Sequence, residues 1–493
     1  MTKEALRLSD VTLMEQGTAQ LQGFNLDILC GEIMGLLPMN GHGLMALIDL
    51  LRSNPQLEFG YVYLQEELVN SWRAPRAHDN RIAVISSVSS LVDGLTVADN
   101  IFVLRPGFRA WLIRPGVLVR QVQPVLDALG VHIAADAYVD TLTVFERVTV
   151  ELVKAIVAGC RLIILREIGA MLSDPELMRL HAILRKYARE GVSFLYIGFH
   201  YEELVQICDR TAVYSNGRVL KILRPQDGDL PYEERYVRRV REQMGQQEPV
   251  SGEEPVLLVR DLCAGRVRGL SLYARPGDCA VVQDLQNQIF DDLIATLTGE
   301  RAIERGEIRL AGRLFAPGVA RDIAILRERP DESMIFPQLS YLDNLCMTVD
   351  HRLPKIWMDA RMRAGIRKEW AQRVGDDVFD LTPGQLTRRQ RYDLVFQRIL
   401  LQRPKAVFCI QPFKGADVRL RMHIWELLKA LLNQGITVII LAVNLADAFT
   451  LATRLIRVEQ GTVRCYEKSE FDQLPFTAPW LQLYKRPADA QGE

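Results

Sequence analysis

The chain has 493 residues, which is too long for a single hydrophobic core, so two to four domains are expected. Its composition, 48% apolar and 25% charged, is that of an ordinary soluble globular protein. The 60 basic and 61 acidic residues leave a net charge of −1, which argues against a general nucleic-acid binder, because such proteins need an excess of Lys and Arg.

The elements predicted in the first half alternate between strands and helices. Gly41 and Gly43 follow an apolar string and predict a tight turn into a helix. Residues 161–166 and 192–198 resemble buried parallel strands, and residues 175–190 between them have apolar side chains at helical spacing. This alternation implies an α/β fold with helices on both faces of a largely parallel sheet.

The second half repeats this order at residues 405–410, 419–434 and 437–443. Asn344 matches Asn100, and further pairs share a nearly constant offset of about 244–246 positions. These further pairs are Gly31 with Gly277, Arg166 with Ile410 and Gly217 with Gly461. Two homologous domains are the simplest explanation of a constant offset.

The repeat and the local composition predict the domain boundaries. We expect a first domain at 1–224, a polar linker at 225–254, a second domain at 255–475 and a C-terminal tail at 476–493. A more helical insert is expected in each domain, at about 103–160 and 347–402.

Targeting and metal signals are missing from the sequence. Residues 1–13 contain no signal-peptide pattern, and no stretch reaches the roughly 18–20 apolar residues that span a bilayer. The eight cysteines are far apart and form no CxxC pair, so neither a metal site nor a disulfide framework is expected. We therefore expect a cytoplasmic protein without direct membrane insertion, which reaches the inner face of a membrane only through a partner.

The order of segments resembles the tandem ATP-binding subunit of bacterial monosaccharide importers of the ribose and galactose type. The resemblance covers roughly residues 5–475. Residues 31–47 resemble the family's strand, phosphate loop and helix, and residues 140–165 resemble its signature helix and Walker B strand. Residues 260–278 resemble the abbreviated start of the family's second domain. The resemblance implies two tandem ABC-type P-loop-NTPase-like domains, each with a mixed or parallel sheet core and a helical subdomain.

In the first phosphate loop, this resemblance places Leu44 where the family has its lysine and Met45 where it has a hydroxyl. The lysine reaches the β- and γ-phosphates and the hydroxyl holds Mg²⁺. Asn40, Gly41 and Gly43 stay as weak candidates for phosphate contacts.

The second loop, from Asp284 to Asp291, contains no glycine and has Phe290 at the lysine position. We expect its two carboxylates to repel a phosphate, so this loop is not expected to bind one.

The Walker B positions, which hold Mg²⁺ and polarise the attacking water, are Arg166 and Glu167 in the first copy. In the second copy they are Ile410 and Gln411. Only Glu167 keeps its family identity, so no intact catalytic set is expected.

The switch histidine aligns with Phe199 and Val443, and the glutamine of the glutamine loop aligns with Ser87. His200 is one residue late, and on a strand it would point to the opposite face. The adenine-stacking aromatic aligns with Glu15.

The signature motif of one domain closes over ATP bound to the other in this family. Phe145 and Glu146 stand in the first signature, and Arg388 and Arg389 fill both glycine positions of the second. The arginine pair is a candidate anion site, with a salt-bridged or solvated pair as the structural alternative.

Together these changes predict the loss of ATP binding and hydrolysis. Hydrogen bonds to charged groups contribute about 1.5–3 kcal/mol each. Losing the lysine, the Mg²⁺ ligands and several amide contacts therefore removes about 6 kcal/mol or more of the free energy of ATP binding. A micromolar site would then bind more weakly than millimolar. No cofactor is expected, and ATP with Mg²⁺ would bind only if the site were atypical but functional.

The leading interpretation is a pseudo-ATPase scaffold or regulatory subunit, docked on a membrane permease or an active homologous ATPase, with dimerisation possible. The first alternative is an atypical but functional ATP-binding subunit that energises carbohydrate import. The second is a soluble sensor that binds another anion in the inter-domain cleft.

Overall fold

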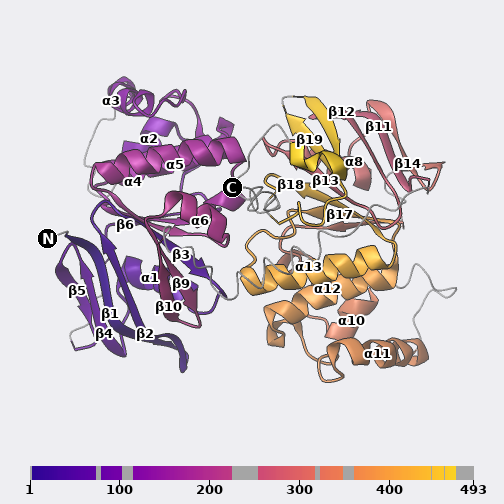
Figure 1. The fold of residues 1–493 in the computed structure, drawn as a ribbon, viewed down its shortest axis with the longest axis horizontal. Coiled ribbons are helices and arrows are strands. Elements are labelled where there is room, and N and C mark those ends of the chain that lie inside the picture. Colours follow the sequence, from indigo (N-terminus) through magenta and orange to yellow (C-terminus); the bar gives the residue numbers. More distant parts are fainter. Residues whose placement is uncertain are drawn as a thin grey trace, which may run out of the picture. The chain divides into compact units, whose positions relative to one another are not determined.

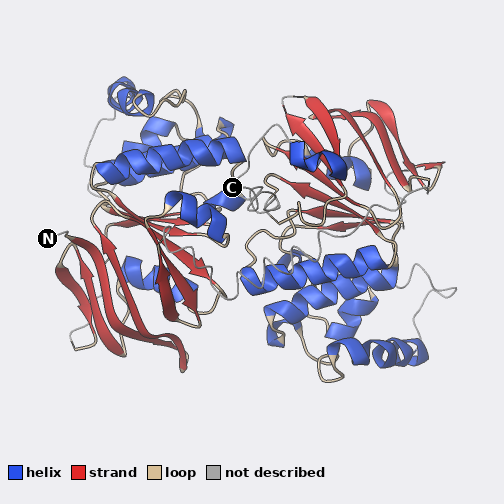
Figure 2. Cartoon of the chain, in the orientation of Figure 1, coloured by secondary structure: helices blue, strands red, loops and turns tan. Residues whose placement is uncertain are grey.

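The computed structural model describes residues 3–73, 79–102, 115–224, 254–316, 322–347, 360–445, 447–459 and 461–473. The chain divides into two compact units, Met1–Tyr236 and Val237–Glu493, which are described separately (Figures 1 and 2). The expected linker and tail lie almost wholly outside the described residues, as does the beginning of each helical insert.

Unit 1 contains two sheets. The first is antiparallel, in the order β2-β1-β4-β5. Its strands are β1 (Glu4–Glu15), β2 (Thr18–Leu29), β4 (Phe59–Leu64) and β5 (Glu67–Ser71). The second has the order β10-β9-β3-β8-β7-β6 and is parallel except for β10. Its strands are β3 (Ile33–Pro38), β6 (Ile82–Ile85), β7 (Leu162–Arg166), β8 (Ser193–Ile197), β9 (Arg210–Ser215) and β10 (Arg218–Leu223).

The helices of unit 1 cover both faces of the six-stranded sheet. They are α1 (Leu44–Ser53), α2 (Val97–Phe102), α3 (Pro115–Asp127), α4 (Val144–Val157), α5 (Asp174–Arg189) and α6 (Tyr201–Ile207), with 3-10 turns η1 (Val139–Thr141) and η2 (Ile168–Ala170). Helix α1 is packed into a core shared by both sheets, whereas α4 and α5 lie on the opposite side (Figure 1).

Unit 2 repeats this architecture. Its antiparallel sheet has the order β12-β11-β14-β15: β11 (Leu257–Ala264), β12 (Val267–Ala274), β14 (Arg305–Leu310) and β15 (Arg313–Leu314). Its six-stranded sheet has the order β16-β17-β18-β13-β19-β20. These strands are β13 (Cys279–Asp284), β16 (Ile323–Leu326), β17 (Ala406–Ile410), β18 (Thr437–Ala442), β19 (Arg454–Glu459) and β20 (Thr462–Glu467).

The helices of unit 2 are α8 (Phe290–Thr298), α9 (Pro330–Ser333), α10 (Tyr341–Cys346), α11 (Ala360–Val374), α12 (Arg388–Gln402) and α13 (Val418–Asn433), with 3-10 turns η5 (Pro383–Gln385) and η6 (Lys468–Gln473). They follow those of unit 1 except that, among the described residues, α9 has no counterpart in unit 1 and α6 has none in unit 2.

The repeat extends to individual hydrogen bonds. Asn100 is fully buried, donates to the Val92 carbonyl and accepts from the Val92 N–H. Asn344 makes the same two bonds to Phe336. Each asparagine therefore closes the loop before its helix, and the equivalence inferred from the sequence is confirmed at this position.

The predicted strands and helices are confirmed with ends shifted by one or two residues. The antiparallel sheets were not predicted. No helix among the described residues is long and apolar enough to cross a membrane.

Candidate functional site

The first phosphate-loop position lies between β3 and α1, and the turn predicted there forms. Gly43 is the residue before α1 and has φ +71°. A Cβ on Gly43 would lie 2.0 Å from the Gln20 carbonyl oxygen. This glycine is therefore required by packing against β2, whatever the loop binds.

The polar groups of this loop are bonded to the protein itself. The Asn40 amide donates to Ser215 Oγ (3.1 Å) and Asn216 Oδ1 (2.8 Å), and its oxygen accepts from the N–H of Asn216 and of His42. The Tyr214 hydroxyl donates to the His42 carbonyl. Asn40, the polar candidate of this loop, thus fastens the loop to the turn after β9.

Arg166 occupies the region next to the first loop. Its Nε donates to Glu167 Oε1 at 3.0 Å, and its Nη1 lies 2.9 Å from Met45 Sδ. Glu167 follows β7 in the left-handed region, with φ 58°. The guanidinium therefore joins Met45 to Glu167, the two residues that the resemblance aligns with the family's Mg²⁺-holding hydroxyl and catalytic carboxylate. Leu44, at the lysine position, is buried in the core of unit 1.

The second loop surrounds a carboxylate of its own. Asp284 is only 3% exposed, and it accepts backbone N–H groups from Gln286 (3.0 Å), Gln288 and Ile289 (2.8 Å). We expected the charge of Asp284 to repel a phosphate. In addition, its carboxylate accepts hydrogen bonds from backbone N–H groups of the loop. Phe290 begins α8 and is buried.

The remaining Walker B and switch positions carry apolar or amide side chains. Ile410 ends β17, Gln411 follows it with φ 41°, and Val443 is buried directly after β18. The expectation for His200 was wrong, because β8 ends at Ile197 and His200 is the N-cap of α6. Strand alternation therefore does not apply to it or to Phe199.

Both signature helices begin with a capping box. Thr143 Oγ1 accepts from the Glu146 N–H, and Glu146 Oε2 accepts from the Thr143 N–H at 2.9 Å. Thr387 and Gln390 make the equivalent pair at α12. Two backbone N–H groups at the start of each helix are thus bonded to these side chains.

The arginine pair of the second signature is split in the structure. Arg388 donates to Asp331 Oδ2 at 3.0 Å and to the Gly415 carbonyl at 2.9 Å, and Asp331 is buried. Arg389 is exposed. Arg388 therefore has an internal carboxylate partner, as the structural alternative proposed.

The other positions singled out lie on the surface of unit 1. Ser87 and Glu15 are exposed, as is Gly41 in the first loop. Within the described ranges, no group of three or more His, Cys, Asp or Glu side chains is placed to hold a metal ion.

The contacts made by Asn40, Arg166 and Asp284 were missed by sequence reasoning, although the residue types were noted. The contacts of Asn40 with Ser215 and Asn216 and of Arg166 with Met45 join residues far apart in the chain. For Asp284, the acidic residue at the end of a strand, just before a helix, was the available signal.

Comparisons with known proteins agree on one family. The family model described as ABC transporter matches residues 21–168. The ribose import ATP-binding protein RbsA 1 of Burkholderia cenocepacia is 26% identical over 468 residues, covering 90% of this chain and 89% of that protein. RbsA 1 of Rubrobacter xylanophilus is 26% identical, covering 93% and 94%.

Among solved structures, the ATP-binding cassette MJ1267 in its ADP conformation has a TM-score of 0.40 at 17% identity, covering 45% of this chain and 91% of that chain. CbiO1 from Clostridium perfringens has a TM-score of 0.40 at 17% identity, covering 49% and 95%. The chain is thus similar to ATP-binding cassette proteins: a family model matches residues 21–168, and ribose import ATP-binding proteins align along about nine tenths of the chain, which folds as two repeated α/β units.

Proposed function

We propose that this chain is an ATP-binding-subunit-like protein of the sugar-importer type that has lost nucleotide binding and hydrolysis. It acts as a pseudo-ATPase scaffold or regulatory subunit at the inner face of the membrane, docked on a permease or an active homologue. The relatives named as ribose import ATP-binding proteins support the importer type, because they align over about nine tenths of the chain.

The position of Arg166 carries the proposal. A cation paired with Glu167 neutralises the carboxylate that would polarise the attacking water, and it repels a second cation such as Mg²⁺. Leu44 and Met45 supply neither a positive charge nor a hydroxyl to replace what is lost. Without metal and lysine, the developing charge of a phosphoryl transfer has no stabilising group.

The two loops add independent support. Asn40 uses its amide to hold the first loop, and Asp284 puts a negative charge inside the second. A triphosphate would have to displace these contacts before making its own, so the free energy of binding would be reduced further.

Restoring the family residues tests the proposal. The triple variant Leu44→Lys, Met45→Ser, Arg166→Asp is compared with the parent chain for binding of a fluorescent ATP analogue with Mg²⁺. We expect binding at least tenfold tighter in the variant than in the parent chain. Equal, tight binding by both proteins would refute the loss of this site.

One observation favours a second candidate, an atypical but functional ATP-binding subunit that energises carbohydrate import. Glu167 keeps its place at the end of β7, next to an intact turn into α1. ATP hydrolysis by the purified parent chain that is abolished by Glu167→Gln would favour this candidate. Gly43→Asp is unsuitable as a test, because the glycine is needed for packing.

The sensor alternative depends on the arginine pair. Arg388 would have to leave Asp331 to receive another anion, which weakens this alternative. A phosphorylated metabolite that raises the melting temperature of the parent chain, but not of Arg389→Ala, would support it.

A further inference from the structure

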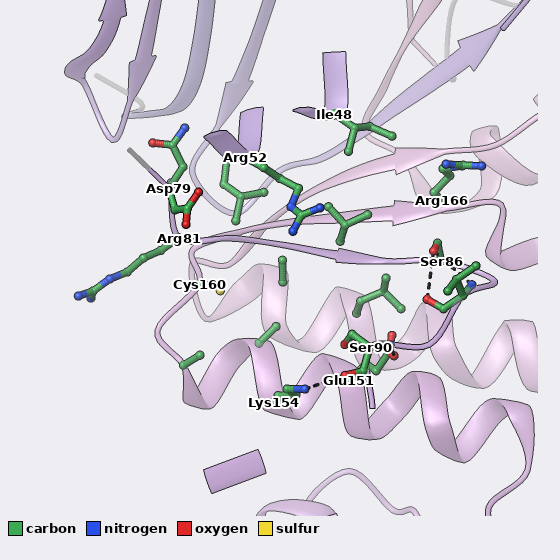
Figure 3. A pocket seen from close by; sticks show the side chains of 18 of the residues that line it. Ile48, Arg52, Asp79, Arg81, Ser86, Ser90, Glu151, Lys154, Cys160 and Arg166 are labelled. Carbon is green, nitrogen blue, oxygen red and sulfur yellow. Dashed lines mark hydrogen bonds between the residues drawn. The ribbon is translucent and has the colours of Figure 1, made fainter. Parts of the chain in front are cut away.

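A groove with a volume of about 1070 Å³ runs along one edge of the six-stranded sheet of unit 1 (Figure 3). Its floor is β6 with its flanking residues, 81–86. One wall is α1, which contributes Ile48 and Arg52, and the other is α4, which contributes Glu151 and Lys154. The groove therefore lies entirely within one unit.

The floor strand is an edge strand. Among the described residues, β6 pairs only with β7. Alternate residues of a strand point their N–H and C=O groups to opposite sides, so part of the β6 backbone faces the groove. Ala83 and Val84 are only half-buried, in keeping with an uncovered edge.

Hydrogen bonds hold this edge in place at both ends. Before β6, the Asn80 N–H donates to the Arg52 carbonyl at 2.6 Å, and the Asn80 amide donates to the Leu51 carbonyl at 2.7 Å. After β6, Ser89 Oγ donates to Glu151 Oε1 at 2.7 Å, and Lys154 Nζ donates to the Ser90 carbonyl at 3.1 Å. A preformed edge of this kind loses little conformational entropy when it binds a further strand.

The shape of the groove limits what can pair there. Helices form both walls, so a second sheet, with its own covering layers, would collide with α1 and α4. A single extended segment fits between the helices and reaches the strand.

The groove is lined by four basic residues, Arg52, Arg81, Lys154 and Arg166, and by three acidic residues, Asp49, Asp79 and Glu151, and Arg166 is paired with Glu167. Glu151 already accepts from Ser89 and from the Ser90 N–H. Within the part of the chain that the structure describes, no carboxylate lies within ion-pair distance of Arg52. Figure 3 shows Arg52 and Lys154 on opposite walls, with the Arg52 guanidinium directed into the groove.

Two acidic residues, Asp49 and Asp79, line the groove at exposed positions. Burial lowers the pKa of Lys154, and the Glu151 charge partly offsets this effect. A further carboxylate near the ammonium would favour its charged form and would itself be stabilised.

Unit 2 repeats only part of this chemistry, because Arg398, at the position equivalent to Lys154, donates to the Met334 carbonyl as Lys154 does to the Ser90 carbonyl. At the position equivalent to Arg52 it has Thr298, and Asp322 precedes its edge strand β16. The segment after β16 folds into α9, where Asp331 pairs with Arg388. Arg52 is therefore a feature of unit 1 rather than of the repeat.

We propose that the β6 groove binds an extended, acidic segment of a partner protein. The segment adds as a strand to the β6 edge, and its carboxylates pair with Arg52 and Lys154. Backbone pairing supplies affinity and the charges supply selectivity. This binding does not depend on whether the nucleotide sites function.

Three labelled peptides of about eight residues test the proposal by fluorescence anisotropy with the full chain. The first alternates Val and Asp, the second alternates Val and Lys, and the third is the acidic peptide with alternate backbone nitrogens methylated. We expect the acidic peptide to bind about tenfold or more tightly than the other two. Methylation removes the N–H donors needed for strand pairing and leaves the side chains unchanged.

A charge reversal provides the second readout. Arg52→Glu should weaken binding of the acidic peptide about tenfold and should strengthen binding of the lysine peptide. Arg189→Glu, a reversal at an exposed position on α5 outside the groove, should change neither.

Equal binding of the acidic and lysine peptides would overturn the charge selection. Equal binding of the methylated peptide would overturn strand addition, and no binding of any peptide would overturn the site. None of these failures would bear on nucleotide binding, which is measured separately.

Discussion

Replacing Asp284 by alanine should destabilise unit 2 although no ligand is lost. The Asp284 side chain lies at the end of β13 and bonds the backbone N–H groups of Gln286, Gln288 and Ile289. It therefore holds the loop together at the N-terminus of α8, where the helix dipole also favours a negative charge.

The magnitude follows from these bonds. Hydrogen bonds to a charged group contribute about 1.5–3 kcal/mol each, so three give an upper bound of about 5–9 kcal/mol. Gln286, Asn287 and Gln288 are exposed, so water replaces part of what is lost. We expect Asp284→Ala to lower the free energy of unfolding by about 2–4 kcal/mol, and Asp284→Asn, which keeps an acceptor, by about 1–2 kcal/mol.

The assay is urea unfolding of the full chain read by hydrogen–deuterium exchange, which separates the amides of unit 2 from those of unit 1. The control is Asp291→Asn, an exposed acidic residue in the first turn of α8, which should cost at most about 1 kcal/mol. If the backbone amides of residues 285–298 exchanged no faster in Asp284→Ala than in this control variant, the carboxylate would not hold the loop.

Three further predictions concern stability. Gly43→Ala should lower the melting temperature of unit 1 more than Gly159→Ala, because both residues have positive φ but only at Gly43 would a Cβ collide with a neighbouring strand. Arg388→Ala should destabilise unit 2 by about 3 kcal/mol, because a buried carboxylate loses its partner, whereas Arg389→Ala should change little. Burial, aided by a nearby arginine, lowers the pKa of His181 from 6.5 to about 4, so below pH 6.5 the unfolded chain binds a proton that the folded chain does not. Stability of unit 1 should therefore fall by about 3 kcal/mol between pH 6.5 and 4, and His181→Phe should remove that part of the pH dependence in acid unfolding curves.

The α/β core was predictable because its signals are local. Residues 162–165 and 438–443 are continuous apolar strings, and residues 175–190 have one apolar face, so strand and helix follow from neighbouring residues. The repeat fixed equivalent positions such as Asn100 and Asn344.

The antiparallel sheets were missed because their strands are half-exposed. In β1, buried and exposed residues alternate irregularly and the pairing to β2 contains register shifts, so the period-2 signal is broken.

The loss of the nucleotide site stays a prediction from the sequence, whereas the contacts that its residues make came only from the structure. Leu44 and Met45 were recognised from the spacing of the loop. The contacts of Arg166 with Met45 and of Asn40 with Asn216 join distant segments, so they depend on the tertiary fold. His200 was wrongly placed on a strand, because the end of β8 was placed too late.

The central claim is that neither unit binds nucleotide tightly, and calorimetric titration of the purified full chain with Mg-ATP tests it most directly. We predict no saturable heat at nucleotide concentrations up to about 1 mM, as expected when the lysine and Mg²⁺ contacts are missing. A stoichiometric binding isotherm with a dissociation constant below about 100 µM would contradict the account.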